Sequence, residues 1–274
     1  MTPTLGRRVL AEAVGSAALV AVVVGSGIQA TELTDDVGVR LLANSLATVF
    51  GLGVLITLFG PVSGAHFNPV VTLAAWFTGR RTPDGLPLRD VAAYLPAQTA
   101  GAIGGAVLAD AMFAKPLVEW STHDRSAGHL WLGELVATAG LVLLVFGLGR
   151  TGRAHLAPAA VASYIGAAYW FTSSTSFANP AVTIGRAFTD TFAGIAPASV
   201  GPFIAAQTAG AALGLTLMTA VFPTHPEPTP PEPAPPTPVP APPTPVPAPP
   251  TPVPVPVQGE PELTARPNSR PATP

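Results

Sequence analysis

The sequence predicts an all-α membrane protein built as an inverted repeat, with six transmembrane helices and two half-helices. Two observations lead to this fold class. The first 222 residues contain six long apolar runs, and three short motifs occur twice in the same order. The remaining segment, 223–274, differs in composition, because 23 of its 52 residues are proline. The two segments therefore obey different structural rules.

Composition excludes several classes of function. Only 10% of the 274 residues are charged, and the first 222 carry 11 basic and 11 acidic residues. Without a basic surface, nucleic-acid binding is not expected. The absence of cysteine excludes disulfides and thiolate chemistry. The histidines show no metal-ligand spacing, so we expect neither a metal nor another cofactor, and no enzymatic step.

Each of the six apolar runs is a predicted membrane span, because crossing a bilayer takes roughly 20 residues. The first run, 9–28, contains a single charge, Glu12. A signal peptide is the alternative for this run, but Glu12 interrupts it and further spans follow. The other runs cover 41–61, 91–113, 130–148, 156–171 and 198–222.

Charged residues between the spans predict the topology. Arginines precede span 1 and lie between spans 2 and 3 and between spans 4 and 5, whereas the segment between spans 1 and 2 is acidic. Basic loops face the cytoplasm, so both termini are expected there.

Three motifs occur in both halves of the body. The pairs are AQTAGA at 97–102 and 206–211, Asn-Pro-x-Val-Thr at 68–72 and 179–183, and the segments that begin at Glu12 and at Glu134. The halves, 1–125 and 126–222, hold three spans each. Because three is odd, the second half inserts upside down relative to the first. AQTAGA also begins a GxxxG pattern in each half, which predicts helix contact faces.

An Asn-Pro pair opens a short apolar stretch in each half. Asn68 and Asn179 suit helix N-caps, and Pro69 and Pro180 suit the first helical turn. At about 1.5 Å per residue, each stretch covers roughly half of the ~30 Å bilayer core. The half-helices are expected at 68–78 and 179–189. Inserted from opposite sides, their N-termini would meet at the midplane.

The junction of two helix N-termini has a definite chemistry. Unpaired N–H groups and helix dipoles make its centre positive, which repels cations and protons. The asparagine amides can donate hydrogen bonds, and the irregular segments 63–67 and 173–178 would expose carbonyls along a cavity. This predicts a passive channel for small neutral solutes. The alternatives are an ion-coupled secondary transporter, which also uses inverted repeats, and an ion channel.

The two motifs Ser63-Gly-Ala-His-Phe-Asn-Pro-Val-Val-Thr72 and Ser176-Phe-Ala-Asn-Pro-Ala181 resemble those of the aquaporin, or major intrinsic protein, superfamily. The resemblance covers about residues 7–222. It implies an hourglass fold with one pore per chain, and a homotetramer. The Asn-Pro-x triplet of the first motif ends in Val70, where the family usually has alanine, while that of the second ends in Ala181.

The resemblance also implies a selectivity filter at the outer end of the pore. The family's filter arginine corresponds to Val182, and the other three positions to Thr48, Ala167 and Ser176, with Phe50 as the alternative to Thr48. Without large or charged residues at these positions, the constriction is expected to be wider and less polar. Larger neutral solutes should then pass.

The sequence around the second motif, 172–197, is similar to that of bacterial aquaglyceroporins associated with arsenic resistance. The implied solutes are arsenite or related metalloid acids and glycerol, and the implied location is the inner membrane. A water-selective aquaporin is the alternative.

Two charged or titratable residues near the motifs each allow two interpretations. Arg186 either reaches into the outer vestibule or, the favoured interpretation, lies at the membrane surface and pairs with Asp190. By the resemblance, His66 lies at the cytoplasmic side of the pore, and we favour pore lining over pH gating.

Glu12 and Glu134 lie at matching repeat positions near the start of spans 1 and 4. A proton relay is one role for such residues. We favour a structural role, in which each carboxylate accepts backbone N–H bonds from an irregular segment. The tail repeats APPTPVP, which favours extended polyproline II. It is expected to be a solvated spacer rather than a ligand for a partner, and no tail partner can be named.

Overall fold

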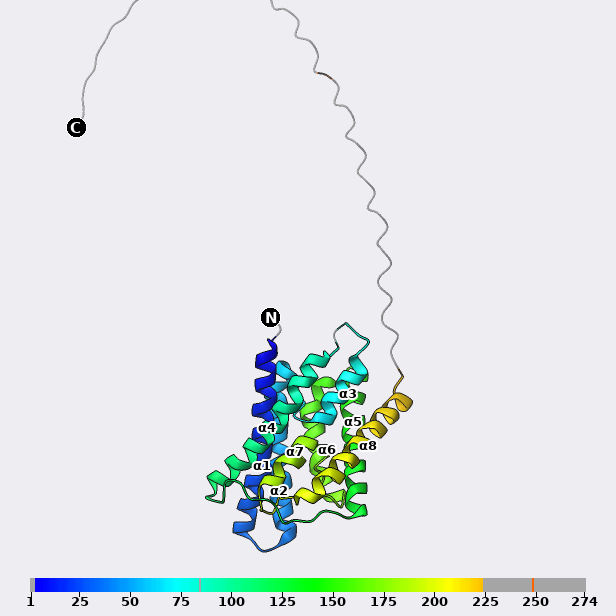
Figure 1. The fold of residues 1–274 in the computed structure, drawn as a ribbon. Coiled ribbons are helices and arrows are strands. Elements are labelled where there is room, and N and C mark those ends of the chain that lie inside the picture. Colours follow the sequence, from blue (N-terminus) through cyan, green and yellow to red (C-terminus); the bar gives the residue numbers. More distant parts are fainter. Residues whose placement is uncertain (1–2, 84, 224–247, 249–274) are drawn as a thin grey trace, which may run out of the picture. The chain divides into compact units, whose positions relative to one another are not determined.

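The structure is a computed structural model, and it describes residues 3–83, 85–223 and 248. The predicted proline-rich tail, 223–274, therefore lies almost entirely outside the described residues. The described part contains only helices and no strand (Figure 1). This confirms the predicted all-α class.

Ten helical elements follow one another along the described chain (Figure 1). They are α1 (Leu5–Leu33), α2 (Val37–Ser63), α3 (Pro69–Gly79), α4 (Leu88–Met112), α5 (Gly128–Arg150), η1 (Ala154–Leu156), α6 (Ala157–Phe171), α7 (Pro180–Gly185), η2 (Arg186–Phe188) and α8 (Pro197–Val221). Five of these helices, α1, α2, α4, α5 and α8, are long and apolar enough to cross a membrane. The helix α6 has 15 residues, but the 3-10 turn η1 precedes it directly. Together they extend about 28 Å, close to the thickness of a bilayer core.

The most extensive contacts between helices join α1 to α4 and α5 to α8. These two pairs are equivalent in the two halves of the repeat. A Cβ atom on Gly101 would collide with the carbonyl oxygen of Ala13, and one on Gly105 with that of Ala17. In the second half, Cβ atoms on Gly210 and Gly214 would collide in the same way with the carbonyl oxygens of Leu135 and Ala139. Only glycine allows the backbones to approach this closely, so the GxxxG patterns are helix contact faces.

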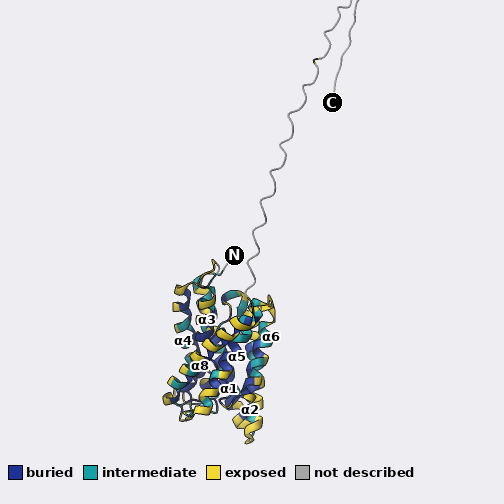
Figure 2. Ribbon diagram, turned by 90° about the vertical axis from the view of Figure 1, so that its right-hand side faces the viewer, coloured by how far each residue is buried: buried dark blue, intermediate teal, exposed yellow. Residues whose placement is uncertain are grey.

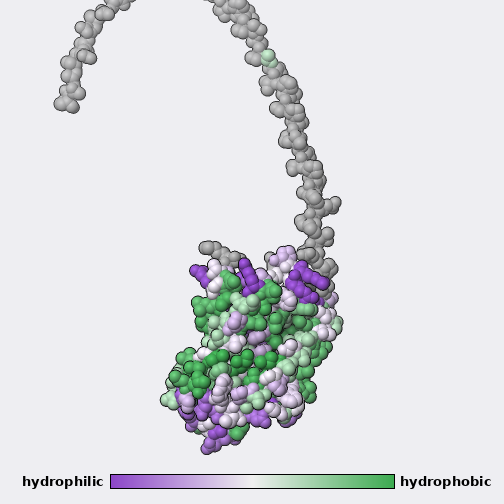
Figure 3. Space-filling model, in the orientation of Figure 1, coloured by the Kyte–Doolittle hydropathy of each residue, from purple (hydrophilic) through white to green (hydrophobic). Residues whose placement is uncertain are grey.

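The two halves interleave rather than standing apart. The helix α2 lies against α6, and α7 lies against α4, and these two pairs make the most extensive contacts between the halves. Buried residues lie along the inward faces of the bundle, and exposed ones lie along its outer faces (Figure 2). A broad apolar band crosses the middle of the body, with hydrophilic residues gathered toward both ends (Figure 3). This distribution suits a protein that crosses the membrane several times.

The second half-helix is shorter than the sequence predicts. The helix α3 has 11 residues, but α7 has only six and then tightens into the 3-10 turn η2. The main-chain oxygen of Arg186 accepts a hydrogen bond from the N–H of Ile195, which turns the chain back on itself at that point. The helical path therefore runs from Pro180 to Phe188, close to the predicted 179–189, but only its first six residues are α-helical.

Candidate functional site: the cavity between the two half-helices

The two half-helices begin at the two predicted asparagines. Asn68 Oδ1 accepts a hydrogen bond from the Val70 N–H at 3.1 Å, and Asn179 Oδ1 accepts one from the Ala181 N–H at 3.0 Å. The proline after each asparagine occupies the first helical position, where no N–H is needed. Each side chain is thereby fixed through its oxygen, and its amide nitrogen points away from its own helix.

Each amide nitrogen bonds across to the other half. Asn68 Nδ2 donates to the carbonyl oxygen of Ala178 at 2.8 Å, and Asn179 Nδ2 donates to that of Phe67 at 2.7 Å. The two helix N-termini are therefore joined end to end by a symmetrical pair of hydrogen bonds. An amide has two N–H groups, and both asparagines line a central cavity, so each has one donor left for a solute.

The backbone before each asparagine adopts an uncommon conformation. Ala65 and Phe67 have φ of 49°, and Ser176 and Ala178 have φ of 51° and 48°. These values lie in the left-handed region, which non-glycine residues rarely occupy. The same positions are affected in both repeats, so this geometry is a property of the fold, and it needs contacts that hold it in place.

A buried glutamate holds each of these segments. Glu134 is fully buried and accepts hydrogen bonds from the N–H groups of Phe177 and Ala178, at 2.9 and 2.8 Å. Gln207 Nε2 donates to the same carboxylate at 2.7 Å and to the Thr183 hydroxyl at 2.8 Å. The carboxylate thus satisfies backbone donors that the left-handed turns leave without helical partners.

Glu12 makes the equivalent contacts in the first half. Its carboxylate accepts from the N–H groups of His66 and Phe67, at 3.0 and 2.7 Å. Ser63 Oγ and Gln98 Nε2 donate to it at 2.6 and 2.8 Å. These are the contacts that the structural interpretation of the two glutamates requires.

A cavity of about 200 Å³ runs past this junction. Most of its wall is apolar and comes from α1, α2, α5 and α6. The polar or charged residues that line it are Thr48, His66, Asn68, Tyr169, Ser176, Asn179 and Arg186. Donors at the centre and apolar walls around them allow a neutral hydroxylated molecule to exchange water for protein contacts, while a bare ion finds little compensation.

Three of the four residues assigned to the filter line this cavity: Thr48, Ser176 and Val182. Thr48 is 2% exposed, whereas the alternative, Phe50, is 70% exposed. The geometry therefore favours Thr48 over Phe50.

The assignment of Ala167 to the filter needs a correction. Ala167 is exposed on the outer face of α6 and does not line the cavity. Tyr169 lines it instead, and its hydroxyl lies 3.1 Å from Thr48 Oγ1. Two residues along a helix correspond to about 200° of rotation, so a register error of two positions selects the opposite face. Val161, Ile165 and Tyr169 all line the cavity. Their four-residue spacing is the sequence signal that identifies the cavity-facing side of α6.

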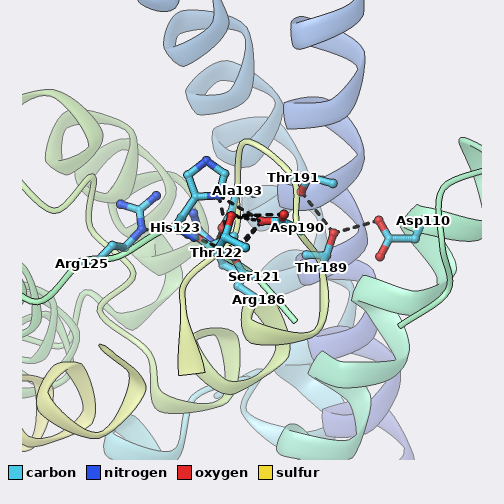
Figure 4. A network of polar contacts seen from close by, with 11 residues as sticks. Asp110, Ser121, Thr122, His123, Arg125, Arg186, Thr189, Asp190, Thr191 and Ala193 are labelled. Atoms are coloured by element: carbon cyan, nitrogen blue, oxygen red, sulfur yellow. Dashed lines mark hydrogen bonds and ion pairs between the residues drawn. The ribbon is translucent and has the colours of Figure 1, made fainter. Parts of the chain in front are cut away.

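Arg186 is 3% exposed and lines the same cavity. Its Nε donates to the carbonyl oxygen of Ala193, and its guanidinium lies 3.4 Å from the centre of the Phe177 ring. The predicted pairing with Asp190 is wrong. Asp190 instead accepts from the N–H and hydroxyl of Thr122 (Figure 4). The Thr122 N–H is the main reason why the pKa of Asp190 lies below its ordinary value.

His66 also lines the cavity, from the opposite half of the repeat. Its Nδ1 lies 3.1 Å from Thr72 Oγ1, and its ring packs edge-on against Tyr94. The cavity is therefore lined by a histidine from the first half and an arginine from the second. Within the described residues, no group of three His, Cys, Asp or Glu side chains could hold a metal.

Comparison with known proteins gives a consistent result. Residues 1–176 match the model of the major intrinsic protein family. The chain is 50% identical over 214 residues to aquaglyceroporin AqpS of Rhizobium meliloti, which covers 78% of this chain and 89% of that protein. It is 30% identical over 188 residues to the glycerol uptake facilitator protein of Pseudomonas aeruginosa, covering 57% of this chain and 63% of the relative. The solved structure of the aquaglyceroporin from Plasmodium falciparum has a similar fold, with a TM-score of 0.55 and 19% identity over 80% of this chain and 97% of that one.

Proposed function

The chain belongs to the major intrinsic protein family, and we propose that it is a passive membrane channel for glycerol and other small uncharged solutes. The family consists of channels rather than enzymes, so the proposal includes no chemical step. The observation that carries it is the junction of Asn68 and Asn179, whose remaining N–H donors face a mostly apolar cavity.

The energetics of this junction favour hydroxylated neutral molecules. A solute that enters an apolar cavity loses hydrogen bonds to water, each of which is expensive to leave unmade. Two asparagine donors and the carbonyls of the left-handed segments replace some of these bonds. An ion would lose far more hydration free energy, and it would meet two positive helix ends if it were a cation.

We assign the constriction to Thr48, Tyr169, Ser176 and Val182, with Arg186 beside them. Val182 stands where the family's arginine is expected, and Ser176 Oγ has no hydrogen-bond partner among the described residues. A valine here takes less space than an arginine and adds no charge. Solutes wider than water should therefore pass, and a free hydroxyl is available to bond them.

Within this class, we propose arsenite and related metalloid acids as solutes beside glycerol. Arsenite at neutral pH is uncharged As(OH)3, a compact molecule with three hydroxyl groups, as in glycerol. The same donors and acceptors can bind both. The similarity of segment 172–197 to aquaglyceroporins associated with arsenic resistance supports this choice.

Uptake of arsenite, detected by mass spectrometry in cells that express the chain, tests the solute. Cells that carry the empty vector are the first control. Cells that express the double variant Asn68→Asp with Asn179→Asp, which lacks the central N–H donors, are the second. We expect uptake well above both controls. Glycerol flux without any excess arsenite uptake would reject the metalloid assignment and retain the channel.

Two alternatives make different predictions. A water-selective aquaporin would swell proteoliposomes in response to a salt gradient but would exclude glycerol. An ion-coupled transporter would lose solute uptake when an uncoupler dissipates the ion gradients. Insensitivity to the uncoupler, together with rapid glycerol flux in stopped-flow measurements, is the result expected for the proposed channel.

We further propose that the channel is a homotetramer in the lipid bilayer of the inner membrane, with both termini in the cytoplasm. An even number of crossings places both ends of the body on one side, and the arginine-rich loops support the cytoplasmic side. Mass measurement of the detergent-solubilised protein and protease protection of tagged termini test these two points separately.

A further inference from the structure

A second cavity, of about 380 Å³, lies outside the pathway and shares none of its lining residues. It is found where α1 and α4 end, where α2 begins, and where the segment after η2 passes them. Its charged or titratable lining residues are Glu32, Arg40, Asp110, Lys115, Glu119, His123 and Asp190. The proposed channel gives this cavity no role.

Asp110 is the residue that indicates a ligand. Its side chain is 1% exposed, and its Oδ1 accepts a hydrogen bond from Thr189 Oγ1 at 2.9 Å (Figure 4). Its other oxygen, Oδ2, is buried and has no hydrogen-bond partner within the described ranges. A buried carboxylate oxygen without a donor is costly, so a molecule that supplies one would be stabilised here.

The charge of the cavity indicates the sign of that molecule. Lys115 Nζ pairs with Glu32 Oε1 at 3.1 Å, and Arg40 pairs with Asp35, which does not line the cavity. Asp110 and Glu119 form no ion pair in the described part of the chain. Four carboxylates therefore face two permanent cations and one histidine, which leaves room for a positive ligand.

We propose that this cavity binds a small organic cation with N–H donors, of the primary ammonium class. Its N–H would donate to Asp110 Oδ2, and its charge would balance Asp110 and Glu119. A directly coordinated metal ion fits less well, because no three His, Cys, Asp or Glu side chains among the described residues are close enough to hold one. Ammonium needs no such cage, since it binds through directed hydrogen bonds.

The site is linked to the pathway by one short segment. Thr189, Asp190 and Thr191 line the second cavity, and Ala193, two residues further on, accepts the hydrogen bond from Arg186 Nε (Figure 4). A bound cation would hold this segment and thereby bias the position of Arg186. This part of the inference rests on the proposed function, whereas binding itself does not.

Saturation-transfer NMR on the full chain in detergent micelles tests binding, with methylammonium as the probe. Tetramethylammonium has the same charge and no N–H donor, so its transfer should be much weaker. Asp110→Asn and Glu119→Gln each remove one unpaired charge, and we expect affinities weaker by about tenfold. Because Glu119 is exposed, its variant should fold even where Asp110→Asn does not. Asp36→Asn makes the same charge change outside the cavity lining, keeps an N-cap acceptor for α2 and should bind as the native chain does.

Equal transfer to methylammonium and tetramethylammonium would overturn the proposal. So would native affinity in both Asp110→Asn and Glu119→Gln, or an equal loss in Asp36→Asn.

Glycerol flux with methylammonium present then tests the link to the pathway. We expect a change of about twofold or more in the native chain and none in Glu119→Gln. Binding without any change in flux would overturn the link. If the native chain passes no glycerol at all, the proposed channel function is rejected. The NMR test of binding is independent of that outcome.

Discussion

Val182 lies in the first turn of α7, three residues after Asn179, and its side chain faces the pathway. It is 5% exposed and lies on the same cavity wall as Arg186. A second guanidinium at this position would add bulk to the constriction and place two like charges close together. We therefore propose that Val182, more than any other residue, limits the size of the solute that passes.

Replacing Val182 with arginine should convert the pathway toward water selectivity. We expect glycerol flux to fall by about tenfold or more, because a 1.4 kcal/mol rise in the barrier suffices for that factor, while water flux changes much less. Stopped-flow measurements on proteoliposomes with a panel of solutes provide the test. Val182→Leu adds bulk without charge and is the matched control. Equal glycerol flux in native and arginine forms would show that Val182 does not set the size limit.

Arg186 should act as a barrier to cations rather than as a ligand for neutral solutes. It is the only arginine or lysine in the described residues that lines the pathway. In Arg186→Met, we expect cation conductance or proton leak to rise by about tenfold or more, while glycerol flux changes by only about two- to threefold. Arg125 lies near the same Phe177 ring at 5.0 Å but does not line the cavity, so Arg125→Met is the control. An unchanged leak in Arg186→Met would contradict this role.

At the scale of the elements, the left-handed segments depend on the glutamates that bind them. Glu134→Ala removes the acceptor for two backbone N–H groups and for Gln207. Leaving such buried donors unpaired costs about 1–3 kcal/mol each. We expect a large loss of folded protein in detergent, measured by size-exclusion chromatography and thermal aggregation. The solute preference of the protein that does fold should not change.

Glu119→Ala removes an exposed carboxylate and is the matched control for folding. Wild-type folding of Glu134→Ala with an altered solute preference would favour a transport role for this glutamate over the structural one.

The sequence predicts the elements well where periodicity or duplication determines them. The six spans, the capping asparagines and the GxxxG faces follow from local chemistry that is repeated in both halves. The change to 3-10 geometry after Gly185 does not follow, because it accompanies a contact distant in the sequence, the hydrogen bond from the Ile195 N–H to the Arg186 carbonyl oxygen. Tyr169 was missed for a related reason: the register of α6 is set by its contact with α2, and counting from the motif chose Ala167.

Across the whole molecule, the inverted repeat is symmetrical at its centre and different at its two ends. The asparagine pair and the glutamates match across the halves to within a few tenths of an ångström in their hydrogen bonds. The cavity wall then diverges, with His66 contributed by the first half and Arg186 by the second. The duplication therefore builds the scaffold, and we propose that the residues that break its symmetry adjust selectivity at the two ends of the cavity.

Removing the proline-rich segment 226–274 should leave transport intact. Among the residues that the structure describes, those that line the cavity all lie between Leu19 and Arg186, within the helical body. The last helix ends at Val221, and Arg150 Nη1 donates to the carbonyl oxygen of Phe222 at 2.8 Å, which fixes the end of the body before this segment begins. We expect the truncated chain to insert normally and to carry glycerol within about twofold of the full chain in stopped-flow assays, because all the described lining residues are retained. Lost flux in a truncated chain that elutes as the native oligomer would show instead that the segment takes part in transport.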